Sequence, residues 1–183
     1  MSATGSVGGD ERQRLFLGLR LPDDTLDRIE RWQAEHLSGR VVPRSNLHIT
    51  LAFLGSRPAK EVRELAGVLA AATSNAGEIE LSARRYRETR SVGMVVLEDR
   101  TGEGGRLAER VFDGLEALGV YEREKRPWLP HVTVLRFRSA PRLAPPVPEL
   151  GTFSPSDAAV YISRLRPSGA QYDVLESVPL GGD

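Results

Sequence analysis

Hydrophobic positions recur with a period of two in the clearest strand of this chain, residues 14–20, where Leu15, Leu17 and Leu19 share one face. Phe16 and Gly18 fall on the other face. Similar apolar runs predict six further strands. The seven predicted strands are residues 14–20, 47–54, 79–86, 92–97, 131–137, 158–164 and 172–178.

Three other segments place apolar side chains at helical spacing. They are residues 23–38, 56–75 and 103–118. Residues 139–150 contain four prolines, so this segment is predicted to be a surface connection. The order of strands and helices predicts an α+β or α/β sheet protein with about three helices.

Two of the predicted strands contain the same short pattern, His, apolar, Thr, apolar. It occurs as His48-Ile-Thr-Leu51 and again as His131-Val-Thr-Val134. Alternation along a strand puts the histidine and the threonine on one face. Each motif therefore offers one imidazole and one hydroxyl together, and a two-fold relation between the strands would bring both pairs to one groove.

The chemistry that suits such a pair is general acid and base catalysis, because imidazole titrates near neutrality. Two neutral imidazoles could also bind a metal ion, but no third ligand accompanies these motifs in the sequence. Threonine hydroxyls donate hydrogen bonds with little bulk, which suits the oxygens of a phosphate. The pattern favours hydrolysis of a phosphoryl group with no protein nucleophile.

The amino-acid composition limits the kinds of partner and compartment that fit this chain. The 25 basic and 25 acidic residues give no net charge, so an anionic substrate must be held locally and not by a global field. There is no cysteine, and no stretch is long and apolar enough to span a membrane. We expect a disordered N-terminal tail over residues 1–13, a single domain over residues 14–183, and a cytoplasmic protein.

The residues around both motifs resemble those of the 2H phosphoesterases, and most closely the RNA 2′,3′-cyclic phosphodiesterases, which are also called LigT-like proteins or 2′-5′ RNA ligases. The resemblance is carried by residues 14–22, 42–55 and 130–136, and by the closing segments 161–165 and 172–175. It implies a bilobal α+β fold, with two duplicated βαββ-type lobes whose antiparallel sheets surround a central groove.

The same resemblance implies a role for each site residue. His48 would be the proton donor to the leaving ribose oxygen and His131 the proton acceptor that activates water, so that a 2′,3′-cyclic phosphate opens to a 2′-phosphate. Thr50 and Thr133 would hold the phosphate, and Arg136 would add positive charge. No metal and no cofactor are implied. We expect a monomer that acts on RNA or nucleotide ends, does not bind membranes, and can reverse the reaction as a 2′-5′ ligase.

Strict alternation conflicts with this role for Arg136, because it would place that side chain with the apolar ones. We therefore expect the strand to bulge, twist or end near Leu135. For stacking of a nucleobase we select Phe16, with Trp128 and Tyr161 as alternatives. The basic run from Arg84 to Arg90 either leads an RNA backbone toward the groove or protects an edge strand.

Two other functions stay open. A sibling enzyme that hydrolyses small cyclic nucleotides, such as an ADP-ribose cyclic phosphate, would have the same motifs. An RNA-binding module without turnover would use the groove alone, although binding does not require two matched imidazoles.

Overall fold

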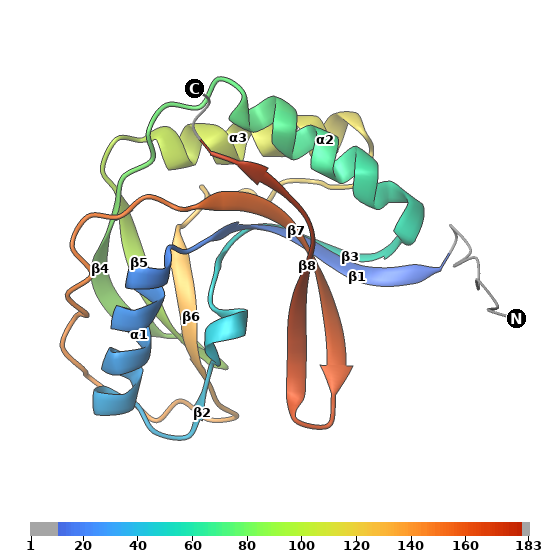
Figure 1. Cartoon of the computed structure of the whole chain (residues 1–183). Coiled ribbons are helices and arrows are strands. Elements are labelled where there is room, and N and C mark those ends of the chain that lie inside the picture. Colours follow the sequence, from blue (N-terminus) through green and yellow to red (C-terminus); the bar gives the residue numbers. More distant parts are fainter. Residues whose placement is uncertain (1–10, 181–183) are drawn as a thin grey trace, which may run out of the picture.

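One curled, antiparallel sheet forms the centre of the structure, a computed structural model that describes residues 11–180 (Figure 1). Its strands are β1 (Arg12–Arg20), β2 (Arg40–Val41), β3 (Ile49–Pro58), β4 (Leu81–Glu88), β5 (Val92–Asp99), β6 (His131–Arg136), β7 (Asp157–Arg166) and β8 (Gly169–Pro179). The helices are α1 (Asp23–His36), α2 (Val62–Thr73) and α3 (Glu103–Ala117), with short 3₁₀ turns η1 (Arg44–Asn46) and η2 (Ala59–Glu61).

The sheet consists of two halves that meet between β3 and β6. Its strand order is β4-β5-β6-β3-β1-β7-β8, and β2 also pairs with β6. Between β3 and β6 the register contains one residue pair, Ile49 with Val132. Because this contact is so short, the two halves can curl apart on either side of it. The predicted α+β fold with two antiparallel halves is confirmed.

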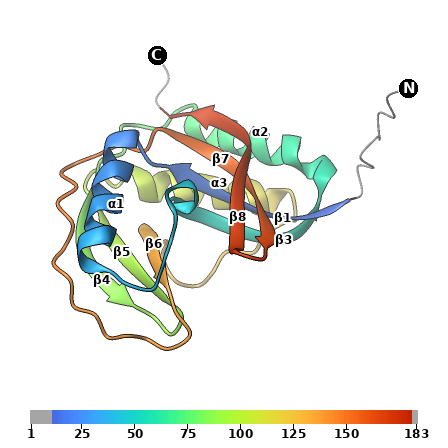
Figure 2. The same cartoon turned by 60° about the horizontal axis from the view of Figure 1, so that its bottom comes forward.

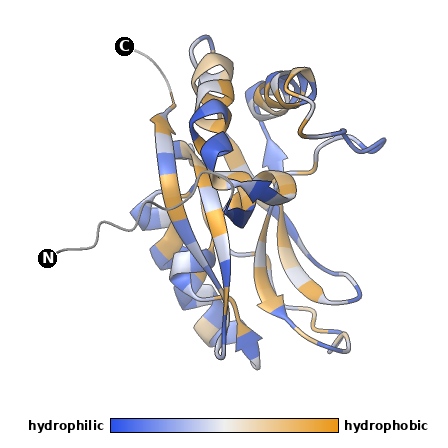
Figure 3. Cartoon of the chain, turned by 90° about the vertical axis from the view of Figure 1, so that its right-hand side faces the viewer, coloured by the Kyte–Doolittle hydropathy of each residue, from blue (hydrophilic) through white to orange (hydrophobic). Residues whose placement is uncertain are grey.

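The helices cover one face of the sheet, and the opposite face, which carries His48, Thr50, His131 and Thr133, is called the groove face. Helices α2 and α3 lie side by side, with α2 against β7 and β8 and α3 against β3 and β5 (Figures 1 and 2). Helix α1 packs on the half that contains β4, β5 and β6, where the centroid of the Trp32 ring lies 6.0 Å from that of Tyr86 in β4. Along the strands hydrophobic and hydrophilic positions alternate (Figure 3). Leu17, Leu19 and Val132 are fully buried in the core.

Most predicted elements are present, and the largest boundary error lies after the first histidine motif. There β3 runs on to Pro58 instead of ending before Gly55, because Gly55 adopts a φ of +69°, a conformation that glycine accepts without strain. Helix α2 consequently begins at Val62 and not near residue 56. The predicted tail was also too long, since β1 starts at Arg12. Residues 1–10 of that tail lie outside the described residues.

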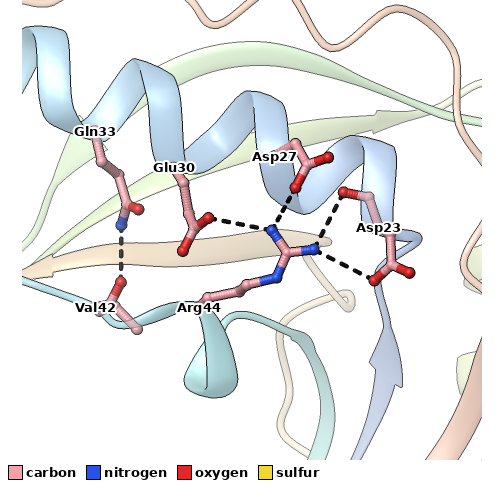
Figure 4. Close-up of polar contacts among 6 residues, drawn as sticks. All are labelled: Asp23, Asp27, Glu30, Gln33, Val42 and Arg44. Carbon is pink, nitrogen blue, oxygen red and sulfur yellow. Dashed lines mark hydrogen bonds and ion pairs between the residues drawn. The ribbon is translucent and has the colours of Figure 1, made fainter.

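Arg44 ties the segment that leads into the first motif to helix α1 (Figure 4). Its guanidinium forms ion pairs with three carboxylates of that helix, Asp27 at 2.6 Å, Glu30 at 3.1 Å and Asp23 at 3.3 Å. Exposed pairs contribute little one at a time, but three on one guanidinium restrict its geometry. The turn η1, which precedes His48, is therefore held against α1.

Gln33 joins the approaches to both motifs from the same helix. Its buried side-chain amide donates to the carbonyl oxygens of Val42 at 3.0 Å and of Val134 at 2.9 Å (Figure 4 draws the first). Val42 precedes the first motif, and Val134 belongs to the second. None of the helices described within residues 11–180 is long and apolar enough to cross a membrane.

Candidate active site

The junction between β3 and β6 brings the two histidine motifs together. Ile49 and Val132, which follow the two histidines, form the pair that joins the strands. Continuing that antiparallel register sets each histidine opposite the threonine of the other motif. The four residues predicted to act together thus gather on the face that turns away from the core: His48, Thr50, His131 and Thr133.

A β-bulge follows each motif at the same place. Leu51 is the extra residue on β3 opposite β1, and Val134 is the extra residue on β6 opposite β5. Each bulge leaves two consecutive buried residues, so the alternation of faces is reversed beyond it. Phe53 and Arg136, each five residues after a histidine, consequently return to the groove face and are exposed. The prediction that the strand bulges, twists or ends near Leu135 is confirmed, and the irregularity is a bulge at Val134.

Both nitrogens of the His48 ring have partners. Nδ1 lies 2.8 Å from the carbonyl oxygen of Asn46, and Nε2 lies 2.8 Å from Oγ1 of Thr50. Because a carbonyl oxygen only accepts, Nδ1 must carry the proton. In the neutral ring, Nε2 is then the acceptor of a hydrogen bond from the Thr50 hydroxyl. The atom that faces the groove is therefore Nε2.

Aromatic rings surround His48. Its ring centroid lies 4.9 Å from that of Phe16, 5.4 Å from that of Tyr161 and 5.5 Å from that of Tyr172. This burial lowers the pKa of His48 from its ordinary value of 6.5 to about 4, against the opposing effect of the Asn46 carbonyl. The charges of His131 and Arg136 lower it further. His48 is consequently neutral at pH 7 in the ligand-free protein.

His131 has more open surroundings. Its Nδ1 lies 2.9 Å from the carbonyl oxygen of Leu129, which again places the proton on Nδ1. Within residues 11–180, its Nε2 has no hydrogen-bond partner, and no aromatic ring contacts the imidazole. The two histidines thus present the same ring atom to the groove, but only Nε2 of His131 is unengaged.

Arg136 extends from β6 toward the β7–β8 hairpin. Its Nη2 donates a hydrogen bond of 3.0 Å to the hydroxyl oxygen of Tyr172. Sequence reasoning missed this contact, because no local pattern relates residues that far apart in the chain. It also missed Asn46, whose position two residues before a motif histidine is the only sequence signal for it.

The prediction that Phe16 stacks a nucleobase is wrong. Its side chain is 3% exposed and lies parallel to the Tyr161 ring at 4.7 Å, so a base cannot reach it. Tyr161 is buried as well. Trp128 is half-buried and donates its indole N–H to the carbonyl oxygen of Thr50 at 3.0 Å. The exposed aromatic ring on the groove face is Phe53, which is 68% exposed.

The basic run from Arg84 to Arg90 lies along the end of β4, which is the edge strand of its half of the sheet, and in the turn after it. Its four arginines are exposed there, as expected both for a protected edge and for a path that leads an RNA backbone. Among residues 11–180, no group of three or more histidine and carboxylate side chains is placed to hold a metal ion.

The chain is similar to known proteins over most of its length. Residues 21–165 match the family model of the 2′-5′ RNA ligase superfamily. The RNA 2′,3′-cyclic phosphodiesterase of Thermus thermophilus is 32% identical, over 93% of this chain and 91% of that relative. The enzyme of the same name from Escherichia coli is 28% identical, over 91% of this chain and 96% of that relative. The crystal structure of E. coli LigT complexed with 3′-AMP is 25% identical and superimposes with a TM-score of 0.74, covering 94% of this chain and all of that one.

Proposed function

Because the chain belongs to the 2′-5′ RNA ligase superfamily, we propose that it is an RNA 2′,3′-cyclic phosphodiesterase that hydrolyses a 2′,3′-cyclic phosphate to a 2′-phosphate. The observation that supports it most is the Ile49–Val132 pair at the β3–β6 junction, which brings together two strands that each carry a histidine and a threonine on the face away from the core. Two imidazoles and two hydroxyls on one face suit a reaction that moves two protons around a phosphate.

The reaction requires one base and one acid. One imidazole accepts a proton from water at its Nε2 while the water oxygen attacks phosphorus. The bond from phosphorus to the ribose 3′ oxygen breaks, and the other imidazole gives its Nε2 proton to that oxygen. A 2′-phosphate and a free 3′ hydroxyl result, and each histidine has exchanged one proton.

The phosphate oxygens would be held by Thr50, Thr133 and Arg136. Thr50 donates to Nε2 of neutral His48, so its proton is not available to a phosphate in that state. When His48 is protonated, Nε2 becomes a donor and can no longer accept from Thr50. Protonation of His48 therefore releases the Thr50 hydroxyl for the substrate.

The family resemblance and the pKa of His48 favour opposite assignments of the acid and the base. Family resemblance makes His48 the donor and His131 the acceptor. The low pKa of His48 in the ligand-free protein instead favours its neutral form, which is the form that accepts a proton. For His48 to be the donor, the negative charge of the bound phosphate must raise its pKa.

A substrate with a good leaving group separates these assignments. When the leaving oxygen needs no proton, loss of the acid costs little, whereas loss of the base costs as much as before. We expect a nitrophenyl phosphodiester to restore the rate of His48→Ala and not that of His131→Ala. Rescue of His131→Ala alone would reverse the two roles, and rescue of neither variant would remove acid catalysis from the mechanism.

Turnover itself is tested with 2′,3′-cyclic AMP and with a short RNA that ends in a 2′,3′-cyclic phosphate, both in excess chelator. Release of the 2′-phosphate, identified by chromatography, is the expected product. If only the mononucleotide is hydrolysed, the enzyme is a phosphodiesterase for small cyclic nucleotides. Binding of the RNA without any product would leave an RNA-binding module, and loss of activity in chelator would contradict the metal-independent mechanism.

A further inference from the structure

We propose that Tyr172 is a positioning residue, which holds the Arg136 guanidinium in the groove beside His48. The inference rests on the proposed function, because it assigns Arg136 to the phosphate of that reaction. It concerns the β7–β8 hairpin, which neither histidine motif includes and which belongs to the half of the sheet that does not contain Arg136 (Figure 1).

Within residues 11–180, the hydrogen bond to Tyr172 is the one interaction that orients the Arg136 guanidinium. Arg136 donates from Nη2 to the Tyr172 hydroxyl at 3.0 Å, and among residues 11–180 this is the only hydrogen bond of the guanidinium. No carboxylate pairs with Arg136 in that part of the chain. A neutral oxygen fixes the orientation of the guanidinium and does not neutralise its charge, so the other N–H groups stay available to an anion.

Tyr172 is itself fixed by Asn46, which is 8% exposed. The backbone N–H of Tyr172 donates to Oδ1 of Asn46 at 3.2 Å, and Nδ2 of Asn46 donates to the carbonyl oxygen of Ala170 at 2.8 Å. The backbone carbonyl of the same asparagine accepts from Nδ1 of His48. One residue therefore sets both the ring orientation of His48 and the place of the hairpin.

The Tyr172 ring is also held in place, by contacts with two neighbouring rings. It meets the rings of Phe16 and His48 edge-on, with centroid distances of 5.0 and 5.5 Å. A ring held on these sides cannot follow the long arginine side chain into solvent, so the arginine is held by the tyrosine and not the reverse. The charge of Arg136 is near enough to act on the pKa of His48.

The test is Tyr172→Phe, which removes the hydroxyl and keeps the ring. We expect kcat to fall about tenfold, as for the loss of one hydrogen bond to a charged group, with little change in KM. In the Arg136→Ala background the same replacement should cost nothing further, because there is no guanidinium left to position. Gln171→Ala is the matched control, since the hydrogen bonds of that exposed side chain within residues 11–180 are to Arg166 and Asp173 alone, and it should keep wild-type kcat.

A second measurement does not depend on turnover. Histidine titration by NMR should show a higher pKa of His48 in Tyr172→Phe and in Arg136→Ala than in wild type, because both move a positive charge away from the ring. Gln171→Ala should leave it unchanged. Wild-type kcat in Tyr172→Phe, multiplied losses in the double variant, or an unchanged His48 pKa would each overturn the proposal. If wild type hydrolyses no cyclic phosphate, the proposed function fails, and the titration still decides the role of Tyr172.

Discussion

The two histidine motifs are nearly identical in sequence and differ in their surroundings. His48 lies among three aromatic rings and shares a hydrogen bond with Thr50, whereas Nε2 of His131 is unengaged within residues 11–180. Beyond the matching bulges, the first motif presents Phe53 to the groove and the second presents Arg136.

This difference shows that strand geometry and neighbouring side chains contribute separately to the site. The strand and its bulge place a histidine, a threonine and one further residue on the groove face, and they do so in the same way in both motifs. The neighbours then set the burial and the hydrogen-bond partners of each imidazole, and at His48 this burial lowers the pKa. A duplicated backbone arrangement can thus supply an acid and a base, provided that the two environments differ.

Removal of either imidazole has the largest expected effect, and the loss of kcat should be similar for both motifs. His48→Ala and His131→Ala should each lower kcat by about 10²–10⁴ with the fold retained, because each removes one proton-transfer partner. The double variant should lose less than the product of the single losses, since both groups act in one displacement. Steady-state kinetics with 2′,3′-cyclic AMP measures this. Full activity in either single variant would contradict the mechanism.

Replacement of the residues that follow the two bulges should affect different kinetic constants. Arg136→Ala should lower kcat by roughly 10²-fold, because it removes a charged donor from the phosphate in the transition state. We expect the exposed ring of Phe53 to stack a nucleobase, so Phe53→Ala should instead raise KM by about tenfold. The kcat and KM of each variant test this division. If both replacements acted on KM alone, the two positions would both bind the substrate and neither would favour the transition state.

The sequence predicted the parts of this site that depend on local periodicity. Alternation along each strand placed His48 with Thr50, and the mismatch at Arg136 was enough to predict that the strand bulges, twists or ends near Leu135. It could not predict the burial of Phe16, whose ring stacks against that of Tyr161 from a strand far along the chain. Such long-range contacts have no local signature, so the burial of a residue facing the groove had to come from the structure.

The pH dependence of stability should test the environment of the histidine in the first motif. The pKa of His48 is about 4 in the folded protein and near its ordinary 6.5 in the unfolded chain. Below pH 6.5 the unfolded state binds this proton more readily, so the contribution of neutral His48 to stability is full above pH 6.5 and is lost as the pH falls toward 4. Urea unfolding of wild type and His48→Gln from about pH 7.5 to about pH 4 measures it. The loss with falling pH should be smaller in the variant, and parallel curves would contradict the low pKa.

The smallest expected effect concerns a hydrogen bond between the segment before the second motif and the first motif. Trp128 lies three residues before His131, and its indole N–H donates to the carbonyl oxygen of Thr50 in the first motif. Trp128→Phe keeps most of the aromatic packing and removes that donor, which should cost about 1 kcal/mol of stability and lower Tm by about 3 °C. That carbonyl belongs to Thr50, whose hydroxyl forms the hydrogen bond with His48. Loss of the donor should therefore weaken the binding of phosphate by Thr50 and lower the activity measured well below Tm, while His131 remains in place. A drop in Tm with unchanged kcat and KM would show that this contact stabilises the fold alone, and that the two motifs keep their relative position through the Ile49–Val132 pair and Gln33.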